Sequence, residues 1–164
     1  MDQHCDGVTG IEGEITVDVT TEWFWEGNIV NTLAHHLQDK GWTIESQADT
    51  RSREQGVDLQ ASKQGIILLV EAKGYPSKSY RDPRRANEQK STNPINQAEK
   101  WYSHALLKAL RLQTTHPHAR VALAFPDFPR YRTLFDETKL SLAKLGISLL
   151  LVNGDGKVWE WRLD

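Results

Sequence analysis

The segment from residue 56 to residue 73 constrains the fold more than any other part of the chain, because its pattern predicts a β-hairpin. Residues 59–62 alternate between apolar and polar, residues 63–65 (Lys-Gln-Gly) are typical of a turn, and residues 66–70 are an unbroken apolar run. Such a run fits a central strand that is buried on both faces. The hairpin is therefore expected to lie in the middle of a sheet.

The predicted central strand ends in charged residues. Glu71 and Lys73 follow the apolar run, and they share a face because side chains alternate along a strand. A hairpin that brings Asp58 beside Glu71 gathers two carboxylates and one lysine around one point. Two carboxylates on rigid strands suit a hard divalent cation such as Mg²⁺, and a nearby lysine can stabilise negative charge or a nucleophilic water. The spacing predicts a metal site at this strand end.

The rest of the chain predicts helices and strands that enclose the hairpin. Helical periodicity marks residues 22–40, 93–113 and 130–145, and short apolar or alternating segments mark strands at 42–48, 119–125, 147–152 and 157–163. This order predicts a single α/β domain over residues 1–164, with three α/β/α layers, a central mixed β-sheet and at least one right-handed parallel crossover.

The first predicted helix carries an acidic residue on its apolar face. Thr21 is a candidate N-cap and Gly41 a candidate C-terminal glycine. Glu26 precedes the apolar Val30 by four residues, so both lie on the same face. A glutamate there either needs a partner or lies at the helix end in water, near the positive pole of the helix dipole.

Charge is distributed unevenly, although the net charge of the 164 residues is only −2. The acidic N-terminal segment, residues 1–20, fits either an edge strand or a flexible arm. Residues 74–93 form a basic loop with tyrosines at positions 75 and 80. This loop could contact phosphates and stack on bases, or simply be a solvated surface loop.

The remaining composition bears on location and assembly. The single cysteine, Cys5, cannot form an internal disulfide, and no signal-peptide pattern or long apolar run is present. We therefore expect a cytoplasmic protein without membrane contact. The aromatic run at residues 23–25 suits either an exposed patch for a homodimer or part of the core.

Four motifs together resemble the PD-(D/E)XK nuclease superfamily, which has the restriction-endonuclease-like fold. They are a helix glutamate, Gly-Val-Asp at residues 56–58, Glu-Ala-Lys at residues 71–73, and a helix Gln-x-x-x-Trp at residues 97–101. The likeness is greatest to the Holliday-junction-resolvase and type IV restriction branches. Two departures are Val57 in place of the motif's proline and Trp101 in place of the usual tyrosine.

The resemblance implies roles for the residues of the predicted metal site. Asp58 and Glu71 would bind Mg²⁺ or Mn²⁺ together with the backbone carbonyl of Ala72. Lys73 would orient the attacking water and stabilise charge in the transition state. Glu26 would hold a second metal or a metal-bound water.

The resemblance also implies a substrate. The expected activity is Mg²⁺-dependent hydrolysis of DNA phosphodiesters by an endonuclease of repair, recombination or defence. Gln97 would orient the site or contact phosphate. The alternative is a non-catalytic nucleic-acid-binding or interaction module on the same fold. The residues expected to contact DNA are Lys78, Arg81, Arg84, Arg85, Lys90 and Trp101.

Overall fold

The computed structural model describes residues 18–49, 56–78, 83–85 and 88–163. Its strands and helices correspond closely to the predicted ones. The strands are β1 (Thr43–Gln47), β2 (Leu59–Lys63), β3 (Ile66–Ala72), β4 (Arg120–Pro126), β5 (Ile147–Val152) and β6 (Val158–Trp161). The helices are α1 (Glu26–Asp39), α2 (Pro94–Thr115) and α3 (Pro129–Leu145), with short 3₁₀ turns η1 (Val19–Thr21) and η2 (Pro83–Arg85).

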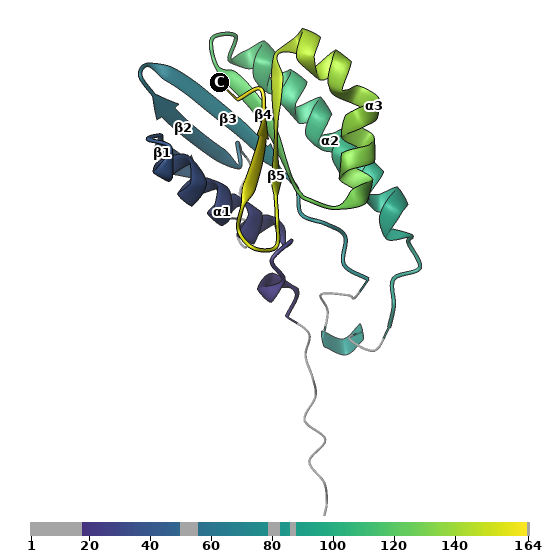
Figure 1. Cartoon of the computed structure of the whole chain (residues 1–164). Helices are drawn as coiled ribbons and strands as arrows, with labels where there is room; N and C mark the ends of the chain where they lie inside the picture. The colour runs from purple at the N-terminus through teal and green to yellow at the C-terminus, as the bar shows by residue number, and fades with distance from the viewer. Residues whose placement is uncertain (1–17, 50–55, 79–82, 86–87, 164) are drawn as a thin grey trace, which may run out of the picture.

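The six strands form one mixed sheet in chain order, from β1 to β6. The pairs β1–β2, β2–β3 and β5–β6 are antiparallel, whereas β3–β4 and β4–β5 are parallel. The two parallel connections pass through α2 and α3, which cover one face of the sheet, while α1 covers the other (Figure 1). The predicted α/β/α architecture with a central mixed sheet is confirmed. Among the described residues, no helix is long and apolar enough to cross a membrane.

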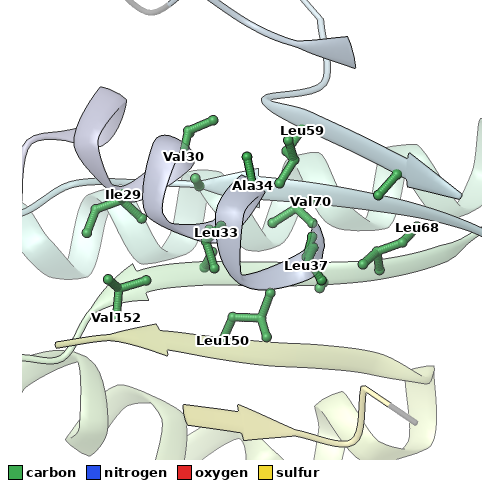
Figure 2. Close-up of a cluster of buried hydrophobic side chains, with 14 of the residues drawn as sticks. Ile29, Val30, Leu33, Ala34, Leu37, Leu59, Leu68, Val70, Leu150 and Val152 are labelled. Atoms are coloured by element: carbon green, nitrogen blue, oxygen red, sulfur yellow. The ribbon is translucent and has the colours of Figure 1, made fainter. Parts of the chain in front are cut away.

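Strand β3 is covered on both faces, which explains its unbroken apolar run. Leu68 and Val70 belong to the core beneath α1, where they meet Leu33 and Leu37 (Figure 2). Leu69 points the other way, into the core beneath α2 and α3. All three strand residues are at most 1% exposed. The fixed alternation of this strand also determines where Glu71 points.

The first helix begins later than the sequence predicts. Thr21 is not its N-cap: residues 19–21 form η1, which Asp18 caps through a 3.0 Å hydrogen bond from the Thr20 amide. The Asn28 side chain donates to the Thr20 and Glu22 carbonyls at 2.8 Å, which holds this segment outside the helix. Helix α1 therefore starts at Glu26.

The ends of α1 and of strand β2 have the backbone conformations of a helix end and a tight turn. Gly41 follows α1 with φ +83°, as expected for a helix-ending glycine. Gln64 and Gly65, within the turn predicted at residues 63–65, have φ values of 51° and 79°, which are typical of a two-residue hairpin turn. For residues 1–20 the sequence left open an edge strand or a flexible arm. Residues 1–17 of this segment lie outside the described part of the chain.

Candidate functional site

The candidate site lies at the C-terminal end of β3, in the sheet region where ligands of α/β proteins are commonly bound. The last antiparallel pair of the hairpin joins Leu59 to Val70. Beyond this pair, the Ala72 amide donates its hydrogen bond to a side chain: Asp58 Oδ2 accepts it at 2.8 Å. The hairpin register therefore places Asp58 beside Glu71.

Four of the predicted site residues are brought together. Asp58 is 7% exposed and Glu71 is 1% exposed, so both carboxylates are buried. Lys73 Nζ lies 2.8 Å from Glu71 Oε1 and 3.6 Å from Glu26 Oε2. Glu26 lies in the first turn of α1, at its positive end, and it also has a charged partner. Glu26 thus lies at the helix end, as one explanation held, but it is half-buried rather than in water and has the partner that the other explanation required.

A second lysine enters the site from α2, and the sequence reasoning missed it. Lys108 Nζ lies 2.5 Å from Glu71 Oε2 and 3.7 Å from Asp58 Oδ1. It follows the buried Ala105 by three residues and precedes the buried Leu112 by four, so it lies along the apolar stripe of the helix. A lysine in that stripe was the available signal, because it needs an acidic partner in the core.

Gln97 does not join this group. It lies near the start of α2 and is half-buried, and within the described residues its side chain forms no hydrogen bond with Asp58, Glu71 or Lys73. Trp101, one turn further along the helix, is half-buried and lines a pocket with Glu26. Trp101 therefore lies close to the site, and the roles of Trp101 in DNA contact and of Gln97 in the site stay predictions.

Two residues of the basic loop, Lys78 and Lys90, lie near the site. The Lys90 amide donates a 2.9 Å hydrogen bond to the Lys78 carbonyl, which brings the ends together. These two residues line adjacent pockets, both of which include Tyr75. The exposed arginines of η2, Arg84 and Arg85, lie further along the loop, and Arg85 pairs with Glu88. Arg81 and Tyr80 lie outside the described residues.

Burial and neighbouring charges shift the pKa values of ionisable groups in the site. Burial, followed by the charge of Asp58, raises the pKa of Glu71 from 4.5 to about 7 although Lys73 opposes this. Burial also raises the pKa of Glu26, again against the effect of Lys73. Burial lowers the pKa of Lys73, but the nearby carboxylates of Glu71 and Glu26 outweigh it, so this pKa is raised overall.

The raised pKa of Glu71 predicts that the metal-free protein loses stability as pH rises. Between pH 4.5 and 7 the folded state holds a proton on Glu71 that the unfolded state has released, so folding is favoured at the acidic end. The free energy of unfolding is expected to fall by up to about 3 kcal/mol over this pH range. Glu71→Gln is expected to make the decline shallower, measured by urea unfolding with EDTA at several pH values.

The matched control for this measurement is Glu137→Gln, which changes an exposed glutamate of α3. It should leave the pH dependence unchanged. If Glu71→Gln unfolds with the same pH dependence as the parent protein, Glu71 does not titrate as its burial indicates.

The donor set at the site fits a divalent cation. In the described part of the chain, no three His, Cys, Asp or Glu side chains are grouped so as to hold a metal by themselves. The Asp58 and Glu71 carboxylates are adjacent, however, and Lys73 Nζ contacts both Glu71 Oε1 and the Ala72 carbonyl, at 2.8 and 2.9 Å. Those oxygens are therefore close together, and they are the hard ligands that Mg²⁺ and Mn²⁺ prefer.

One oxygen of this set, Glu71 Oε2, is buried and is engaged by the Lys108 ammonium rather than by a hydrogen bond of regular geometry. Three carboxylates face only two lysines, which leaves the group with excess negative charge when all are ionised. This excess of negative charge favours an additional cation.

Gly74 fixes the chain immediately after Lys73. A Cβ at Gly74 would lie 2.5 Å from the Phe24 carbonyl oxygen and 2.8 Å from the Glu26 amide nitrogen, so only glycine allows this approach. The Tyr75 amide donates to the same Phe24 carbonyl at 3.0 Å. The segment that follows β3 and carries Lys73 is thus packed directly against the start of α1.

Comparison with known proteins assigns no family. No protein-family model matches the chain, and no curated protein matches it in sequence. Two solved structures resemble it: an XisH family protein from Nostoc punctiforme and an fdxN element excision controlling factor protein from Anabaena variabilis. Each is 19% identical with a TM-score of 0.49, and the match covers 81% of this chain and 97% or 96% of theirs. A likeness at this level assigns neither family nor activity.

Proposed function

We propose that the protein is a metal-dependent nuclease that hydrolyses DNA phosphodiester bonds, with a site of the PD-(D/E)XK type. The observation that carries the proposal is the contact between two buried carboxylates, Asp58 and Glu71, with Lys73 2.8 Å from the second of them. Burying adjacent acids is costly unless a cation compensates them.

The chain supplies ligands for the cation and a separate positive charge. Asp58, Glu71 and the Ala72 carbonyl would hold Mg²⁺ or Mn²⁺. When bound, such a cation supplies Lewis-acid stabilisation of phosphate oxygens and makes water a better nucleophile. Lys73 is held between Glu71 and Glu26, where its ammonium can orient the water and stabilise the negative charge that develops on the phosphoryl oxygens.

The reaction needs no covalent intermediate with the protein. Water attacks the phosphorus, one P–O bond to a sugar breaks, and the leaving oxygen takes up a proton. Glu26, whose pKa is raised by burial, can accept a proton from the water through its carboxylate. The residues of the site thus supply positioning, charge stabilisation and a base.

Asp58→Asn tests the proposal because it keeps the shape of the side chain and removes its charge. We expect the wild-type protein to nick supercoiled DNA with Mg²⁺ or Mn²⁺, and the variant to lose this activity. The matched control is Asp136→Asn, which changes an exposed aspartate of α3 that pairs with Lys139. Nicking is measured by the conversion of supercoiled plasmid to open circles.

Two outcomes would contradict the proposal. Metal-dependent nicking that survives Asp58→Asn would show that another site, or a contaminant, cuts the DNA. Binding of DNA that weakens with salt, without cleavage under any divalent metal, would favour the non-catalytic binding module instead.

A further inference from the structure

A pocket of about 270 Å³ opens directly beside the carboxylate site. Two of the residues that line it, Glu26 and Gly74, also help to form the site. The Glu26 carboxylate is 3.6 Å from Lys73 Nζ, and Gly74 follows Lys73 in the chain. Half of the other lining residues are aromatic: Phe24, Trp25, Tyr75 and Trp101, which come from three separate segments of the chain. A small pocket with four aromatic rings in its lining suits a flat ring rather than an extended side chain.

The four rings of this pocket differ in how they are held. The Phe24 and Tyr75 rings pack on Phe128, with centroid distances of 5.5 and 4.3 Å, so they form a fixed wall. In the part of the chain that the structure describes, the rings of Trp25 and Trp101 pack on no other aromatic ring. Both tryptophans are half-buried and line the pocket, where a ligand can contact them.

We propose that this pocket binds one unpaired nucleobase of the DNA strand, stacked on Trp101. The inference rests on the proposed nuclease function and narrows its substrate to DNA with unpaired nucleotides, such as single strands, overhangs or flaps. Aromatic side chains bind unpaired bases by stacking, whereas a base within a duplex has no free face to offer.

The charges around the pocket favour a base, rather than a phosphate, as its occupant. Glu22 and Glu26 line it, and their carboxylates would repel a phosphate but can accept hydrogen bonds from the amino group of a base. Two lysines carry positive charge near the pocket. Lys73 lies beside Glu26, and Lys90 of the basic loop lines the pocket itself. The sugar–phosphate backbone would therefore follow the lysines while the base enters the pocket.

The packing of Gly74 holds the pocket at a constant distance from the site. Gly74 and Tyr75 are pressed against the backbone of residues 24–26, as described above. The Tyr131 hydroxyl donates a 2.8 Å hydrogen bond to the Gly74 carbonyl from the side of α3. A base in the pocket would thus set which phosphodiester bond lies over Lys73.

The test uses the full chain in EDTA, so that binding is measured without cleavage. One oligonucleotide carries 2-aminopurine in a single-stranded overhang, and a second carries it within a blunt duplex. We expect the overhang to bind more tightly and its fluorescence to be quenched by stacking. Trp101→Leu should weaken overhang binding by about 5- to 150-fold and abolish the quenching, with duplex affinity unchanged.

Two further variants separate stacking from folding. Trp101→Phe keeps an aromatic face and should retain most of the quenching and affinity, whereas leucine, which is also apolar, should not. Trp159→Leu is the control, because Trp159 is a 39% exposed tryptophan of β6 that contacts Phe135 and does not line the pocket. It should leave both affinities unchanged.

The outcomes distinguish this inference from the proposed function. Quenching that depends on Trp101, in a protein that cleaves no DNA, would support the pocket and contradict the nuclease. Metal-dependent cleavage with equal affinity for overhang and duplex, and equal effects of Trp101→Leu on both, would overturn the pocket and leave the nuclease standing.

Discussion

Lys73→Ala is expected to lower the rate of metal-dependent DNA cleavage by about 10²- to 10³-fold, the usual effect of removing one fixed donor of charge stabilisation. The Lys73 ammonium is held by Glu71 Oε1, the Ala72 carbonyl and Glu26 within 3.6 Å, so its position is fixed before any substrate binds. No water or flexible side chain can reproduce a positive charge fixed at that point. The measurement is the single-turnover cleavage rate at saturating protein.

Two companion variants make this result interpretable. Lys73→Arg keeps the charge but replaces a compact ammonium by a planar fork, so we expect it to recover only part of the rate. Lys139→Ala removes a lysine of α3 that pairs with Asp136, and it should cleave normally. A Lys73→Ala protein that is folded and cleaves at the wild-type rate would remove Lys73 from the mechanism.

Lys108→Met is expected to make folding stability depend strongly on divalent metal. Lys108 Nζ lies 2.5 Å from Glu71 Oε2 and 3.7 Å from Asp58 Oδ1, so it is a counter-charge for both acids. Without it, two adjacent buried carboxylates lose a counter-charge. Because the Lys108 side chain is 36% exposed, we expect a loss of about 1–3 kcal/mol in EDTA, less than for a fully buried pair.

Added Mn²⁺ or Mg²⁺ should restore more stability to this variant than to the wild type, since a cation can then bind the carboxylates without displacing a lysine. The measurement is Tm with EDTA and with increasing metal. Lys100→Met, an exposed lysine of the same helix, is the matched control. Equal metal-induced gains in Tm for Lys108→Met and wild type would show that Lys108 and the metal do not share a position.

The parts of the site that were predictable are those set by local sequence. The hairpin register follows from alternation and from the two-residue turn, so it fixes Asp58, Glu71 and Lys73 relative to one another. The layered architecture follows in the same way, because helical and strand periods alternate along the chain. Helix α1 could be placed but not its start, since the Asn28 side chain holds the preceding residues out of the helix.

The contribution of α2 depended on tertiary packing and could not be predicted in the same way. Gln97 and Lys108 both lie on this helix, and its periodicity alone does not say which turn reaches the end of β3. In the folded chain it is Lys108 that contacts Glu71, while the earlier turn places Trp101 beside the neighbouring pocket. The position of a helix along a sheet depends on the length of the preceding connection and on side-chain packing, which no local pattern encodes.

The hairpin has a consequence for the order in which this protein assembles. Asp58 and Ala72, which it joins by a hydrogen bond, are only 14 residues apart, so the two acids and Lys73 can meet early during folding. Lys108 arrives only when α2 docks and β4 pairs with β3, because that helix lies in the crossover between the two strands. Before that docking the carboxylates lack Lys108, so the complete set of charges at the site is a late product of folding and marks a chain whose crossover is complete.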